Sequence, residues 1–131
     1  MENRPRQGRN NKGVALDARM LLSYILKMKK RQRPSKIADL MDTIWEALDS
    51  GRYVDMVHAQ ERQLQRNITR PEYTYVLRHG YHEARKDTFE EPYNAWNYAI
   101  RGKTLDKRDL RVIVSFDDSG MLIITTIEVH K

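Results

Sequence analysis

Apolar residues in the first two thirds of the chain recur at intervals of three and four, the spacing of one face of a helix. The pattern predicts helices over residues 14–31, 35–50, 57–67 and 69–80. Ser35 is a residue type that caps helix N-termini, so we expect the second helix to begin there. The last helix should begin with a capping box and Pro in its first turn, and end at a glycine.

The hydrophobic period changes after residues 81–93, which are polar and predict an exposed connection. Residues 96–101 alternate between apolar and polar, and residues 110–116 and 121–129 are rich in β-formers, with a turn at 117–120. Helices first and strands last predict an α+β domain. We expect N-terminal helices packed on one face of a small C-terminal antiparallel sheet of three or four strands.

The helix predicted from residue 57 carries the pattern that most suggests chemistry. His58, Arg62 and Arg66 follow one another in four-residue steps, which stacks them on one helix face. Histidine transfers protons near neutral pH, and guanidinium groups bind phosphate bidentately, so this row could bind and cleave a phosphodiester. The alternative is an ordinary solvated helix face. The opposite side is expected to be buried through Val57, Leu64 and Ile68.

Positive charge is concentrated at the start of the chain, although the whole chain has a net charge of only +6. Residues 1–36 hold eleven Lys/Arg against two acidic residues, and residues 37–131 hold thirteen against sixteen. A basic arm favours polyanions such as RNA. We expect a disordered tail over 1–13, a basic amphipathic helix over 14–34 and the main domain over 35–131. The candidate RNA contacts of the arm are Arg4, Arg6, Arg9, Lys29, Lys30 and Arg31.

Several classes of site find no support in the sequence. The chain has no cysteine, which excludes disulfides, thiolate catalysis and cysteine-based metal centres. His82-Glu83 lacks the second histidine of a zinc helix, and residues 117–120 are far short of a calcium loop. We therefore expect no metal and no cofactor. No apolar window is long enough for a signal peptide or a membrane span, so a cytoplasmic protein is expected.

From His58 onward the order of motifs resembles the domain of unknown function family numbered 4258. Trp96-x-Tyr98-x-Ile100-x-Gly102 and the strands over 110–114 and 123–127 follow the helical elements in that family's order. The resemblance covers roughly residues 36–131. It implies membership of the barnase, EndoU, colicin and RelE-like fold group, whose members include small metal-independent RNases and toxins. An antitoxin-like inhibitory protein is then an implied partner.

The resemblance also implies a set of site residues. The family's His-Ala element falls on His58 and Ala59, its two arginines on Arg62 and Arg66, and its late strand threonine on Thr126. Gln63 stands where methionine is common in the family. Arg101 is a further candidate RNA contact because it lies on the alternating polar face of its strand. Ser115 and Glu61 are alternatives for the group that completes the site.

Two functions of different classes therefore remain open. The first is an endoribonuclease or toxin-like RNA-binding domain in which His58, Arg62, Arg66 and Thr126 are catalytic. The second is a non-catalytic binding module whose basic N-terminal arm docks on nucleic acid or on an acidic protein partner. The charge distribution supports the second, because a domain with a net negative charge does not attract RNA by its overall field. The basic arm could attract RNA for the domain instead, which keeps the first function open.

Overall fold

The structure, a computed structural model, describes residues 18–25 and 33–130. The side chains of Val57 and His58 also lie outside the described part. The chain divides between Pro34 and Ser35 into two units, of which the first contains a helix over residues 18–25. The predicted tail and most of the basic arm fall outside the described residues, including Arg4, Arg6, Arg9, Lys29, Lys30 and Arg31.

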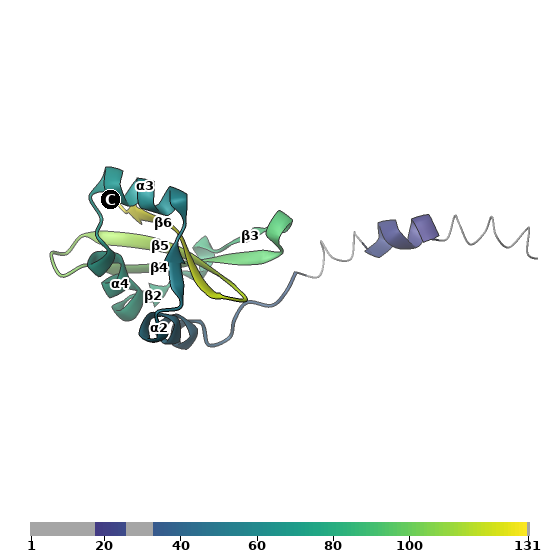
Figure 1. The fold of residues 1–131 in the computed structure, drawn as a ribbon, viewed down its shortest axis with the longest axis horizontal. Helices are drawn as coiled ribbons and strands as arrows, with labels where there is room; N and C mark the ends of the chain where they lie inside the picture. Colours follow the sequence, from purple (N-terminus) through teal and green to yellow (C-terminus); the bar gives the residue numbers. More distant parts are fainter. Residues whose placement is uncertain (1–17, 26–32, 131) are drawn as a thin grey trace, which may run out of the picture. The chain divides into compact units, whose positions relative to one another are not determined.

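Three α-helices precede the long strands of the second unit (Figure 1). They are α2 (Leu40–Ser50), α3 (Val57–Arg66) and α4 (Arg70–His79). Two short 3-10 helices follow, η1 (Ala84–Lys86) and η2 (Glu91–Tyr93).

The six strands form one sheet in the order β1-β6-β5-β4-β2, and β3 also pairs with β4. Every pairing is antiparallel except that of β1 with β6. The α+β prediction is confirmed, with three long strands where the sequence predicts them and three short strands added at the edges. The strands are β1 (Tyr53–Asp55), β2 (Tyr81–His82), β3 (Thr88–Glu90), β4 (Ala95–Lys103), β5 (Asp109–Asp117) and β6 (Gly120–Glu128).

The core lies between the helices and one face of the sheet. Figure 1 shows α3 beside the end of β6, and α2 and α4 beside β2 and β4. Alternate residues of the strands point into this core, among them Ile100 and Val112, which are fully buried with Tyr73 and Leu77 of α4. Burying a side chain of this size stabilises a fold by roughly 1.5–3 kcal/mol.

The prediction that α2 begins at Ser35 is wrong, because the helix begins at Leu40. Tertiary contacts hold the preceding residues outside the helix. The ammonium group of Lys36 pairs with Asp87 at 2.9 Å, and the backbone N–H of Ile37 donates to the Tyr98 hydroxyl at 3.0 Å.

The face of α3 that packs on the sheet differs from the predicted one. Leu64, which we expect to be buried, is 87% exposed, whereas Ala59 is fully buried. Four-residue steps advance by about 400°, so a row at this spacing rotates by about 40° per step. Arg66 therefore lies on the same side of α3 as the buried Ala59, while Arg62 stays exposed. Ile68 is buried as expected, but it follows the end of the helix.

The capping box of α4 is confirmed, since Thr69 and Glu72 exchange side-chain and backbone hydrogen bonds. Gly80 ends the helix as predicted, but with φ −82° and ψ −165° it does not need the left-handed conformation of a glycine cap. A Cβ atom on Gly102 would lie 2.9 Å from the Cα of Gly80. The two glycines thus let the end of α4 approach β4 closely.

The prediction that residues 81–93 form an exposed connection is wrong. They contain two strands and two 3-10 helices, and the side chain of Glu83 is only 4% exposed. Pairing with β4 orders this segment, because the β2 and β3 registers cover β4 on both sides of Ala99. The N–H of Ala99 itself is bound by the Asp87 carboxylate at 2.9 Å.

Candidate functional site

The helix with the predicted basic row is attached directly to the end of β6. The guanidinium group of Arg66 donates a hydrogen bond to the backbone carbonyl of Thr126. On the other side, Arg108 donates to the carbonyls of Arg66 at 3.1 Å and Asn67 at 2.9 Å. The structure therefore brings together Arg66 and Thr126, which are 60 residues apart in sequence.

Arg62 lies one turn before Arg66 and is exposed. Among residues 33–130, its guanidinium group has no hydrogen-bond or ion-pair partner. His58 lies one turn earlier still, in the first turn of α3, but its side chain lies outside the described part. Of the two predicted arginines, whose side chains are both described, Arg62 is the one that the structure leaves open for an anion.

Thr126 is fully buried, and its hydroxyl has no hydrogen-bond partner among the described residues. A buried hydroxyl without a partner lowers the free energy of unfolding by about 1–3 kcal/mol. A protein that retains one either uses it for something other than folding or tolerates the cost. The contact with Arg66 uses the backbone carbonyl of Thr126 and leaves its hydroxyl unsatisfied.

Replacing Thr126 with valine should raise the free energy of unfolding by about 1 kcal/mol, because valine has the same shape and removes the unpaired hydroxyl. Chemical denaturation of the wild type and Thr126→Val measures the change. A loss of more than about 1 kcal/mol would show that the hydroxyl has a partner in solution. Thr125→Val, at the half-buried neighbouring position, is the control.

Arg101 lies within a network of ion pairs. Its guanidinium group binds Asp109 at 2.8 and 3.1 Å and Glu83 at 3.1 Å, while Nε of Arg111 donates to Glu83 at 2.7 Å. The hydrogen bonds from Arg111 and Arg101 hold the pKa of Glu83 below its ordinary value, against the effect of burial. The hydrogen bonds to Asp109 and Glu83 raise the pKa of Arg101. Its charge is thus neutralised within the protein.

The two alternatives for completing the site lie in different surroundings. Ser115 is buried on β5, and its hydroxyl donates to the carbonyl of Trp96 at 2.9 Å. Glu61 is exposed on α3, on the same helix as Arg62. Of these two, only Glu61 is accessible to a ligand of Arg62.

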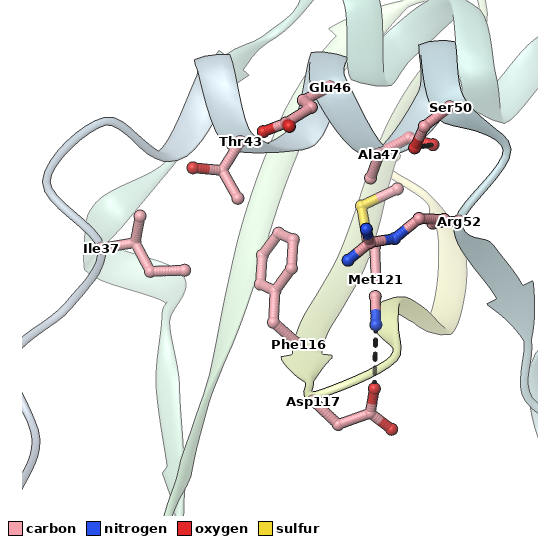
Figure 2. Close-up of a pocket in the computed structure, with 10 residues that line it drawn as sticks. Ile37, Thr43, Glu46, Ala47, Ser50, Arg52, Phe116, Asp117 and Met121 are labelled. Carbon is pink, nitrogen blue, oxygen red and sulfur yellow. Dashed lines mark hydrogen bonds between the residues drawn. The ribbon is translucent and has the colours of Figure 1, made fainter.

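A hollow of 280 Å³ lies between α2, the residue before β1 and the turn that joins β5 to β6 (Figure 2). Figure 2 shows the Arg52 side chain extending over Met121 toward the side where Phe116 lies. This site was not predicted from the sequence, because Arg52 lies between the helices predicted over residues 35–50 and 57–67. Its lining residues are Ile37, Thr43, Glu46, Ala47, Ser50, Arg52, Phe116, Asp117, Gly120 and Met121.

The second unit is a small α+β domain in which helix α3, which carries Arg62 and Arg66, packs against β6. The family model described as Domain of unknown function (DUF4258) matches residues 57–128, from the start of α3 to the end of β6. The chain belongs to this family. No curated protein and no solved structure matches the chain.

Within residues 18–25 and 33–130, no three His, Asp or Glu side chains gather in the manner of a metal site. No helix in these ranges is long and apolar enough to cross a membrane.

Proposed function

We propose that this protein is a metal-independent endoribonuclease of the RelE-like group, with its site on α3 where that helix meets β6. The observation that carries the proposal is the contact between Arg66 and Thr126, which fixes α3 against the sheet. This contact orients the helix so that Arg62 is exposed and without a partner among the described residues. Two of the residues that the family resemblance implies, Arg66 and Thr126, thus come from distant segments and are in contact through the backbone carbonyl of Thr126.

In the proposed reaction, the 2′-hydroxyl of the RNA attacks the adjacent phosphorus and the bond to the 5′-oxygen breaks. His58 takes up the proton of the 2′-hydroxyl, and a water molecule protonates the leaving oxygen. Arg62 binds the non-bridging oxygens, whose negative charge grows in the transition state. Arg66 holds the helix in place. Histidine and arginine suffice for this chemistry, which needs no metal in principle.

Purified protein should cleave single-stranded RNA in the presence of a chelator. His58→Ala should lower kcat by at least about a hundredfold, the usual effect of losing a general acid or base. Arg62→Gln should lower kcat/KM by at least about tenfold, because a charge-assisted hydrogen bond contributes about 1.5–3 kcal/mol. Initial rates on a labelled RNA give both values.

The control is Arg78→Gln, which removes an exposed arginine already paired with Asp49 at 2.8 Å and should leave the rate unchanged. Undiminished cleavage by His58→Ala would remove His58 from the mechanism. Absence of cleavage by the wild type at any RNA concentration would contradict the proposal.

A second candidate function is a non-catalytic binding module. It is supported by the burial of Thr126 and by the ion pairs that occupy Arg101, which leave neither of these two predicted site residues available to RNA. Binding of RNA without cleavage in the same assay would favour this function.

A further inference from the structure

The hollow beside Arg52 is a site that the proposed ribonuclease chemistry does not use. Its floor is apolar, with Met121 fully buried and the ring of Phe116 half-buried. Phe116 meets the ring of Tyr98 edge-on, with centroids 6.2 Å apart, so its orientation is fixed. A fixed aromatic ring in the floor of a hollow offers a surface on which a flat group can stack.

Almost all the polar side chains around this hollow are hydrogen-bond acceptors. Thr43 and Ser50 already donate their hydroxyl protons to helix carbonyls, at 3.0 and 3.3 Å, and retain only lone pairs. Glu46 is exposed and has no partner among the described residues. Asp117 stays ionised, because hydrogen bonds from the hydroxyl and N–H of Ser119 and the N–H of Gly120 lower its pKa.

Among the described residues, Arg52 is the only one with a cationic side chain that lines the hollow. Among residues 35–130, Arg52 and Arg62 are the two arginines whose guanidinium groups have no bonded partner. Arg52 is exposed and lines the hollow together with Met121 (Figure 2), so it can bind an anionic group that extends to solvent. A matching ligand therefore has a flat body, donor groups on its edge and an anionic group at one end.

We propose that this hollow binds a nucleotide whose base carries an exocyclic amino group. The base stacks on Phe116, its amino group donates to Glu46, and its phosphate binds Arg52. Adenine, cytosine and guanine have such an amino group, whereas uracil has none. The volume of 280 Å³ is just below the roughly 300–1,000 Å³ of ligand pockets, so it encloses the base and leaves the sugar and phosphate at the opening.

This inference goes beyond the proposed ribonuclease site, because it concerns a different helix and the β5–β6 turn. If the protein does cleave RNA, the hollow would bind a base of the substrate and give the reaction a sequence preference. If it does not, the hollow remains a nucleotide site of a binding module.

Titration of the full chain with CMP and with UMP, followed by backbone amide NMR shifts, tests the proposal. CMP should move the amides of the hollow, Ser50, Gly120 and Met121, with an affinity at least about tenfold higher than that of UMP. Arg52→Gln should reduce CMP affinity to that of cytidine, because the phosphate loses its partner. Glu46→Gln should reduce the preference for CMP over UMP.

Arg78→Gln is the matched control, since it removes another exposed arginine of the same unit and should leave CMP affinity unchanged. Equal affinity for CMP and UMP would overturn the role of the amino group. The assignment of the hollow to a nucleotide would be overturned if CMP shifted only amides of α3. It would also be overturned if the hollow bound an aliphatic ligand such as leucine but not CMP.

The test also separates this inference from the ribonuclease proposal. His58→Ala should retain CMP binding at the hollow even though its cleavage is expected to be lost. Cleavage by a wild-type protein that shows no shifts in the hollow would overturn only the nucleotide site. Shifts without cleavage would overturn only the ribonuclease proposal.

Discussion

Gly80→Ala is expected to lower the free energy of unfolding by at least about 3 kcal/mol, a large part of the 5–15 kcal/mol that stabilises a typical domain. A Cβ atom at this position would overlap the carbonyl oxygen of Arg101 and lie 2.6 Å from that of Val76. Both obstacles are backbone atoms, so no change of side-chain rotamer relieves the overlap. The end of α4 would have to move away from β4.

Chemical denaturation of the wild type and Gly80→Ala measures this loss, and Gly51→Ala is the control. Gly51 has a φ of 74°, but a Cβ there would meet nothing within 4 Å, so only conformational strain of about 1 kcal/mol is expected. Equal losses in the two variants would show that α4 and β4 are not in close contact.

Glu83→Gln should lower the free energy of unfolding at neutral pH by about 2–3 kcal/mol. The change removes the negative charge between Arg101 and Arg111, which are mostly buried, and weakens two charge-assisted hydrogen bonds. Asp49→Asn breaks the exposed pair with Arg78 instead and should change stability by no more than about 0.5 kcal/mol.

The effect of Glu83→Gln should depend on pH. The hydrogen bond from Arg111 lowers the pKa of Glu83 in the folded state, so the carboxylate contributes stability above the ordinary glutamate pKa of 4.5. This contribution is lost as the pH falls through the lower folded-state pKa. The difference between wild type and variant should therefore shrink below about pH 4.5, and a difference that stays constant would contradict the ion pair.

Local signals in the sequence predict the elements that depend on local contacts. The capping box at Thr69 and Glu72 places the start of α4, and the change of period after residue 93 places the three long strands. These features depend on residues that are close together along the chain, so they can be predicted from a single sequence. The α+β class follows from their order along the chain.

Features that depend on distant residues could not be predicted in this way. The start of α2 is shifted because Ile37 binds Tyr98, 61 residues away, and Leu64 is exposed because the contact of Arg66 with β6 sets the rotation of α3. The sequence around Arg52 does not indicate a ligand site, because the hollow that Arg52 lines is completed by the distant β5–β6 turn. The sequence pattern predicts Arg101 as an RNA contact and does not reveal its pairing with Asp109 and Glu83, because these residues lie 8 and 18 positions away.

The short edge strands of the sheet limit how another protein can recognise this domain. The strands β1, β2 and β3, which flank the long strands, have three, two and three residues, and Arg66 occupies the Thr126 carbonyl beyond β1. Within residues 33–130 the sheet thus offers only short edges to an incoming strand, which disfavours β-augmentation and edge-to-edge aggregation. A protein partner must instead recognise side chains on the helices, the turns or the open face of the sheet.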